Sequence, residues 1–131
     1  MKNKILVVDD ESAIRELLLL ALVQNGYEVT TAKHGQYALL VIDKGEFIPD
    51  IVLTDVGMPV LDGVGLAHQL RTRNIGTEII FMSGGDLGSH TESELKEYSP
   101  YLLFKPFSLK ILEGLIERLL TAGVNDKQPP V

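Results

Sequence analysis

The chain has 131 residues, 45% of them hydrophobic, which suits one domain with a substantial core. The sequence contains no apolar run long enough to span a membrane. Its net charge of −6 argues against direct nucleic-acid binding, because the phosphate backbone is itself negative. The absence of cysteine excludes disulfides, no signal peptide precedes the first predicted strand, and we expect a soluble, cytoplasmic protein.

Short apolar runs predict the strands of a parallel sheet. The runs are rich in β-branched residues and are continuous rather than alternating, as expected for strands that are buried on both faces. The run at 27–31 is the weakest of them. The predicted strands are residues 5–8, 27–31, 51–53, 79–82 and 101–104.

Helical patterns separate these runs. The first predicted helix has Ser12 as its expected N-cap, and Gly26 is positioned to end it. The last has a wide apolar stripe, and the one before it is short and has a single clear core residue. The predicted helices lie between Ser12 and Gly26, at 36–44, at 64–73, at 91–98, and from the cap Ser108 through 119.

The alternation of strands and helices predicts the fold class. Five such pairs favour a doubly wound α/β domain, with a parallel sheet and helices on both of its faces, joined by right-handed crossovers. We expect residues 1–122 to form this domain. The polar segment 123–131, which ends in Gln128-Pro129-Pro130, is expected to be a C-terminal tail or the start of a linker.

Polar residues follow or close four of the predicted strands. In open parallel sheets ligands bind beyond the carboxyl ends of the strands, so these side chains are expected to meet. Carboxylates gathered in a small volume repel one another unless a cation is present, and Mg²⁺ prefers oxygen ligands. The residues are Asp9, Asp10, Asp55, Ser83 and Lys105.

The residue types of this cluster are typical of phosphate chemistry. Lys105 supplies a compact positive charge for one phosphate oxygen, and the Ser83 hydroxyl can donate to another. A carboxylate can itself be the nucleophile in phosphoryl transfer, and Asp55 is the best placed because it ends a strand and precedes a turn.

Each residue taken alone has a simpler structural interpretation. Aspartate favours helix N-caps and turns, Lys105 precedes a proline in a loop, and Ser83 precedes two glycines. The prediction of a site depends on their joint occurrence at successive strand ends. The histidines lack the spacing of metal ligands and are interpreted as solvated surface residues: His34, His68 and His90.

Together these motifs resemble the bacterial two-component response-regulator receiver domain, over roughly residues 2 to 121. The matching pieces are Asp9-Asp10 after the apolar run 5–8, the segment 50–55 that ends in Asp55, Met58-Pro59-Val60-Leu61-Asp62-Gly63, Ser83, and Lys105-Pro106-Phe107. The resemblance implies a flavodoxin-like (CheY-like) domain with strand order 2-1-3-4-5 and five helices on the two faces of the sheet.

The resemblance also implies a role for each acidic residue. Asp55 would accept a phosphoryl group from a histidine kinase, a phosphotransfer protein or a small phosphodonor. Asp9 and Asp10 would hold Mg²⁺, together with Asp55 and the main-chain carbonyl of Gly57. The domain would catalyse its own phosphorylation and dephosphorylation, mainly by electrostatics and in-line positioning.

The remaining site residues would bind the phosphoryl group and change conformation in response to it. Lys105 and Ser83 would bind phosphoryl oxygens, with Ser83 moving toward them on activation and the peptide bond after Lys105 in the cis form. The fourth helix, fifth strand and fifth helix would present the face for an output domain or protein target. A homodimer that forms on phosphorylation is a further assembly that the resemblance suggests.

Two features depart from the family's pattern. The family usually has an aromatic switch residue three positions before the lysine, where this chain has Leu102, and Tyr101 is sent to the opposite face by strand alternation. Leu102 and Phe104 share a face, and either repack as a pair or are simply core or partner-facing residues. Gly57 and Gly85 leave the expected phosphoryl site without flanking side chains, which suggests a short-lived phosphorylated form.

Three classes of function follow from these residues. The leading one is a signalling receiver that accepts phosphate and changes its affinity for a partner. The second is an enzyme such as a phosphatase with an aspartyl phosphate intermediate, although a second general acid and a substrate cap are not evident. The third is a binding module that is never phosphorylated.

Overall fold

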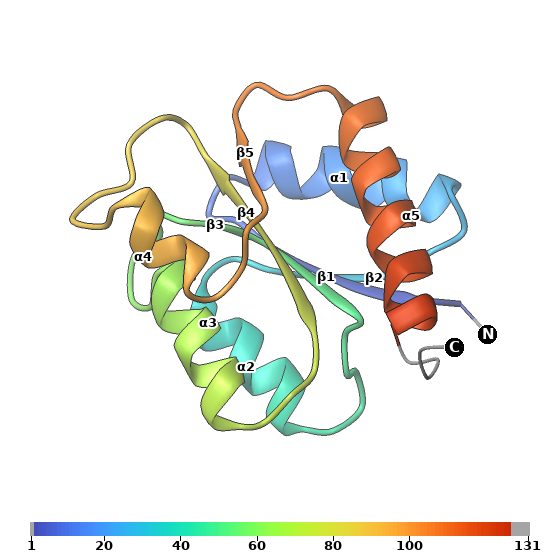
Figure 1. Ribbon diagram of the computed structural model, residues 1–131, viewed down its shortest axis with the longest axis horizontal. Helices are drawn as coiled ribbons and strands as arrows, with labels where there is room; N and C mark the ends of the chain where they lie inside the picture. Colours follow the sequence, from blue (N-terminus) through green and yellow to red (C-terminus); the bar gives the residue numbers. More distant parts are fainter. Residues whose placement is uncertain (1, 127–131) are drawn as a thin grey trace.

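The structure, a computed structural model, describes the main chain over residues 2–126 and the side chains over residues 2–121. Strands and helices alternate along the chain (Figure 1). In chain order the elements are β1 (Lys4–Val8), α1 (Ser12–Gln24), β2 (Glu28–Ala32), α2 (Gly35–Asp43), β3 (Ile51–Asp55), α3 (Gly63–Thr72), β4 (Glu78–Ser83), α4 (Glu92–Lys96), β5 (Leu102–Phe104) and α5 (Leu109–Asp126).

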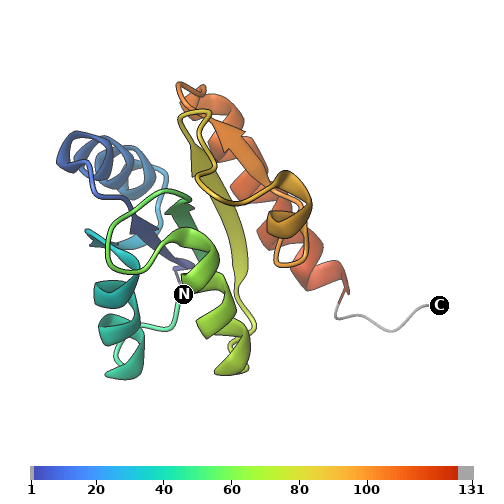
Figure 2. The ribbon, with the colours of Figure 1, turned by 90° about the vertical axis from the view of Figure 1, so that its left-hand side faces the viewer.

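The strands form one parallel sheet in the order β2-β1-β3-β4-β5, which confirms the predicted fold class. Helices α1 and α5 cover one face, and α2, α3 and α4 cover the other (Figures 1 and 2). The order reverses between β1 and β3, so the loops after these two strands run to opposite faces. Ligands in sheets of this kind bind at that position.

The central strands are buried on both faces. In β1, Leu6 and Val8 pack against α2 and α3, while Ile5 and Val7 pack against α1 and α5. All four side chains are fully buried, so each contributes roughly 1.5–3 kcal/mol of hydrophobic stabilisation. This two-sided burial explains the continuous apolar runs of the sequence.

The weaker sequence patterns belong to the edges of the fold. The predicted strand 27–31 is observed one position later as β2, an edge strand that is partly exposed. Helix α4 is a single short segment that begins after the N-cap Thr91 and buries Leu95. Edge elements bury less apolar surface, so their sequences are less strongly patterned.

Two helix ends confirm the predicted residues and one does not. Gly26 follows α1 with a φ of +93°, and the Ser108 hydroxyl accepts a hydrogen bond from the Ile111 N–H at the start of α5. Ser12 was expected to be the N-cap of α1, but it is the first helical residue. The cap position belongs to Glu11, whose N–H donates to Asp9 Oδ1 at 2.9 Å.

Helix α5 continues to Asp126, beyond the predicted domain end at residue 122. Residues 127–131, the rest of the predicted tail, lie outside the described residues, and the boundary between domain and tail stays a prediction. Over residues 2–126, none of the helices combines the length and the apolar character that crossing a bilayer requires.

Candidate functional site

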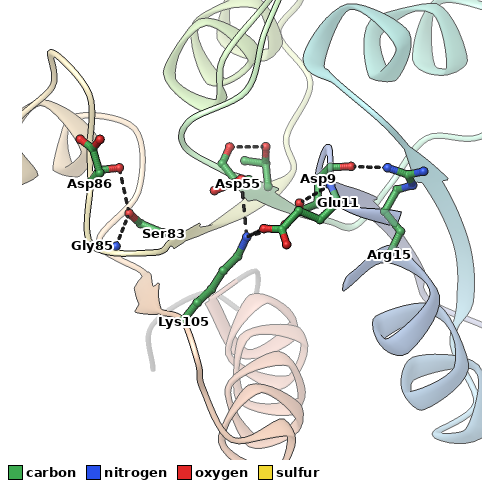
Figure 3. Close-up of polar contacts among 9 residues, drawn as sticks. Asp9, Glu11, Arg15, Asp55, Ser83, Gly85, Asp86 and Lys105 are labelled. Carbon is green, nitrogen blue, oxygen red and sulfur yellow. Dashed lines mark hydrogen bonds and ion pairs between the residues drawn. The ribbon is translucent and has the colours of Figure 1, made fainter. Parts of the chain in front are cut away.

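The carboxyl ends of four strands meet at one edge of the sheet. Asp9 follows β1, Asp55 closes β3, Ser83 closes β4 and Lys105 follows β5. Parallel pairing keeps these ends level, because Asp55 pairs with the residue before Ser83 and Ser83 pairs with Phe104. The register of the sheet therefore gathers residues that lie far apart in the sequence (Figure 3).

Three carboxylates form the acidic part of the site. Asp9, Asp10 and Asp55 each offer an oxygen, and these oxygens lie within 4.8 Å of one another. Asp9 is fully buried and Asp55 is 8% exposed, whereas Asp10 faces solvent. Hard oxygen donors with one open side suit Mg²⁺, which keeps several of its waters when it binds to proteins. The donor set therefore fits the cation that the sequence predicts.

Lys105 lies between the carboxylates. Its Nζ is 2.8 Å from Asp9 Oδ2, 3.5 Å from Asp55 Oδ2 and 3.6 Å from Glu11 Oε1 (Figure 3). Burial alone would lower the pKa of Lys105, but the hydrogen bond to Asp9 and the charges of Asp55 and Glu11 raise it overall. The amine therefore stays protonated at neutral pH and balances part of the negative charge.

The carboxyl of Asp55 is destabilised in its charged form. Burial is the largest cause, repulsion from Asp9 and Asp10 adds to it, and Lys105 opposes it, so that the pKa of Asp55 rises to about 6. Near neutral pH this carboxylate lacks a full set of compensating charges. A perturbed acid in a cluster of this kind is typical of a functional site.

Ser83 lies at the same edge, but its hydroxyl is turned away from Asp55. Its Oγ donates to the main-chain carbonyl of Asp86 at 3.2 Å and accepts from the N–H of Gly85 at 3.1 Å (Figure 3). The structure therefore brings Asp9, Asp10, Asp55 and Lys105 together, and it holds the hydroxyl of Ser83 within its own loop.

The space around Asp55 is shaped by glycines. A Cβ added to Gly57 would meet nothing within 4 Å, so the position is open as expected. A Cβ on Gly63 would lie 2.4 Å from the main-chain oxygen of Asp55, and the Gly63 N–H donates to Val56 O at 2.9 Å. Glycine is therefore required at position 63 for α3 to begin directly against the end of β3.

The sequence gives little indication of two further features, one in α1 beside the site and one in the loop that follows β3. Arg15, one turn into α1, donates from Nη1 to the main-chain oxygen of Asp9 at 2.8 Å and holds the β1–α1 loop. Val60 has a φ of 72° and is 77% exposed. A β-branched residue in the left-handed region costs about 1–2 kcal/mol. Backbone strain of this kind clusters at functional sites.

The positions around β5 agree with the expected faces. Leu102 packs partly buried on the side of α3 and α4, and Tyr101 packs on the side of α1 and α5, so the two point to opposite faces. Phe104 is 48% exposed. The peptide bond between Lys105 and Pro106 is cis, as the resemblance implies.

Comparisons with known proteins agree with this geometry. The sequence matches the response regulator receiver domain model over residues 5–117. It is 42% identical over 119 residues to a probable transcriptional regulator, ycf27 of Pyropia yezoensis, with 91% of this chain and 48% of that protein covered. It is 37% identical over 129 residues to response regulator MprA of a Mycobacterium species, with 98% and 55% covered. The chain spans about half the length of these relatives.

Solved structures show the same fold. The chemotaxis protein CheY4 of Vibrio cholerae aligns with a TM-score of 0.80 at 30% identity, over 91% of this chain and 99% of that one. Response regulator TrrA of Thermotoga maritima, solved in complex with Mg²⁺ and BeF, aligns with a TM-score of 0.76 at 35% identity and the same coverage.

The fold and the site define a flavodoxin-like α/β protein with three clustered carboxylates at the switch point of its sheet. The family match extends over almost the whole of that fold. The chain belongs to the response-regulator receiver domain family, and is a signalling protein of the two-component type.

Proposed function

We propose that this domain accepts a phosphoryl group on Asp55 in a Mg²⁺-dependent reaction. The observation that supports it is the setting of this carboxylate, which is 8% exposed at a strand end, has two other carboxylates within 4.8 Å and lies 3.5 Å from Lys105 Nζ. Asp9, Asp10, Asp55 and the carbonyl of Gly57 would hold Mg²⁺. Bound there, the cation would supply positive charge that offsets the carboxylates and the charge of an incoming phosphoryl group.

The side chains then divide the chemistry. An Asp55 carboxylate oxygen attacks phosphorus, the bond from phosphorus to the donor's histidine nitrogen breaks, and an acyl phosphate forms. Lys105 donates to one phosphoryl oxygen, and Ser83 turns to donate to another. Hydrolysis by water restores the carboxylate, so that the domain catalyses both its phosphorylation and its dephosphorylation.

The donor is proposed to be a histidine kinase or a phosphotransfer protein in the cytoplasm, with small phosphodonors as substitutes. A small donor brings no binding surface of its own. The site itself must therefore supply the catalysis in that case, which makes a small donor the sharper probe of these residues.

Incubation with acetyl phosphate and Mg²⁺ tests this proposal. We expect intact-mass analysis to show one labile phosphate addition, absent from the Asp55→Ala variant and after chelation of the metal. Asp43→Ala, which removes an exposed carboxylate at the end of α2, is expected to behave as the wild type. An unmodified wild-type protein would leave a binding module as the better interpretation, and continuous release of phosphate from a phosphoester would favour a phosphatase.

The output of the switch is proposed to pass through the face formed by α4, β5 and α5. Its exposed apolar residues include Phe104 and Ile111, and Leu102 lines a shallow hollow against α5. The partner we propose is an output domain, because the curated relatives are about twice as long as this chain.

Repacking of Leu102 together with Phe104 would couple the site to this face. We expect Leu102 to change rotamer between structures with and without beryllofluoride, a phosphoryl mimic, in the presence of Mg²⁺. An unchanged rotamer would rule out the repacking and leave both residues as core or partner-facing groups. Ile80, which is fully buried in β4 on the side of α1 and α5, is the internal control and is expected to stay in place.

A further inference from the structure

His90 joins the two loops that flank Asp55 on the side of α3 and α4. Its Nε2 lies 3.0 Å from Asp62 Oδ2, and its Nδ1 lies 2.9 Å from Glu94 Oε2. Asp62 is the N-cap of α3, and Glu94 lies in the first turn of α4. Only 20% of the imidazole side chain is exposed, so the earlier interpretation of His90 as a solvated surface residue is wrong.

Both contacts require a proton on the ring nitrogen. Ionised carboxylates only accept hydrogen bonds, and neutral imidazole has a single N–H. If both carboxylates are ionised, the two hydrogen bonds can therefore exist together only on a doubly protonated ring. In keeping with this geometry, the hydrogen bonds to Asp62 and Glu94 raise the pKa of His90, and burial opposes them only in part.

Two elements packed against the ring present charged groups to it. Asp62 comes from the β3–α3 loop and Glu94 from α4, and these are the carboxylates that face the imidazole among residues 2–121. Asp86, on the same loop as His90, instead accepts from the N–H of Gly88 at 2.8 Å. The protonation of His90 thus depends on two partners from different loops.

Hydrogen bonds connect His90 back to Ser83. The His90 N–H donates to Leu87 O at 3.1 Å, Asp86 binds Gly88 through its carboxylate, and the carbonyl of Asp86 accepts from Ser83 Oγ. Short-range hydrogen bonds between Gly85 and His90 therefore hold the β4–α4 loop in the conformation that keeps the Ser83 hydroxyl away from Asp55. Those Ser83 bonds must break before the hydroxyl can reach a phosphoryl oxygen.

We propose that protonated His90 is a positioning residue that holds the β4–α4 loop in its resting conformation and makes phosphorylation of Asp55 dependent on pH. The proposal rests on the proposed function of the site. It adds a regulation of Asp55 phosphorylation by a residue outside the acidic cluster. The contacts that would carry it are those of His90, in the β4–α4 loop, with Asp62 at the start of α3 and Glu94 in α4.

The direction of the pH dependence follows from linkage. Because the pKa of His90 is raised in the resting fold, both contacts are complete below the ordinary pKa of histidine and are lost as pH rises through the raised value. Rising pH therefore releases the loop and favours the phosphorylated state. By reciprocity, phosphorylation lowers the affinity of His90 for its proton.

Nuclear magnetic resonance of the metal-free protein tests the contacts of His90 with Asp62 and Glu94 independently of phosphorylation. The His90 ring is expected to titrate above the ordinary range of histidine, and Glu94→Gln is expected to move its midpoint down. The chemical shifts of the Gly84 and Gly85 main-chain amides are expected to change with pH at the same midpoint as the His90 ring. This change is expected to be absent in His90→Gln. Amide chemical shifts that do not change as His90 titrates would overturn the proposal.

Beryllofluoride binding in the presence of Mg²⁺ tests the link to the site. As the pH rises through the range in which His90 loses its proton, the affinity for beryllofluoride is expected to increase in the wild type. This increase is expected to be about threefold to tenfold larger than in His90→Gln, the size of effect that two partly exposed ion pairs allow. Titration of Asp55 affects both proteins equally and cancels in this comparison. His68→Gln, on the exposed side of α3, is expected to keep the wild-type profile.

Equal pH profiles for the wild type and His90→Gln would overturn the proposal. Absence of a beryllofluoride adduct in every variant would instead overturn the proposed role of Asp55. In that case the amide titration still decides whether His90 positions the loop, so the two failures are distinguishable.

Discussion

Replacing Lys105 with methionine is expected to lower the rate of phosphorylation by acetyl phosphate about 100-fold at saturating Mg²⁺, the usual size of effect for one preorganised electrostatic group. Methionine keeps an unbranched chain and removes the charge. The lost group lies 2.8 Å from Asp9 and 3.5 Å from Asp55, where the proposed phosphoryl transfer would accumulate negative charge. A time course of intact mass measures the rate.

The same substitution is expected to destabilise the metal-free protein. Asp9 is fully buried, and among residues 2–121 the loss of Lys105 leaves its carboxylate with the N–H of Glu11 as its remaining hydrogen-bond partner. Removing one member of a buried ion pair costs about 3–5 kcal/mol. Because the Lys105 side chain is 15% exposed and the pair borders solvent, we expect a smaller loss of about 2–3 kcal/mol in the free energy of unfolding, measured by chemical denaturation.

Magnesium distinguishes this electrostatic effect from a simple packing defect. A bound cation replaces the missing positive charge, so the gain in Tm on adding Mg²⁺ is expected to be larger in Lys105→Met than in the wild type. Lys44→Met, which removes an exposed charge after α2, is expected to leave both rate and Mg²⁺ response unchanged. Equal Mg²⁺ responses in the wild type and Lys105→Met would contradict the assigned electrostatic role.

The sequence predicts the acidic part of the site well because parallel pairing translates strand ends into spatial neighbours. Once the apolar runs are assigned, Asp9, Asp55 and Lys105 must arrive at one edge. The direction of the Ser83 hydroxyl cannot be predicted in this way, because it depends on how the β4–α4 loop folds. That loop has no repeating pattern from which the hydrogen bond to Asp86 can be inferred.

Contacts between loops account for the other residues that sequence reasoning missed. His90 and Asp62 are 28 positions apart, and their meeting depends on the packing of α3 beside α4. Gly63 looks like an ordinary turn residue until the end of β3 is placed against it. Val60 lies in the left-handed region where glycine or asparagine is the usual choice, so local preference alone predicts the wrong conformation.

Gly57→Asn is expected to lengthen the life of the phosphorylated form about tenfold, because a polar side chain would fill the open approach by which water reaches the acyl phosphate. A Cβ at this position meets nothing within 4 Å, and the main-chain carbonyl proposed to hold Mg²⁺ is retained. Gly85 is a poorer test site, since its φ of +106° strains any residue with a side chain.

The lifetime is measured by removing acetyl phosphate and following the loss of the phosphate addition by intact mass. Gly76→Asn is the matched control, because a Cβ there also meets nothing within 4 Å and the position lies between α3 and β4, at the other end of the sheet. An unchanged lifetime in Gly57→Asn would mean that water reaches the acyl phosphate by another route. In that event the openness beside Asp55 does not set how long the signal lasts.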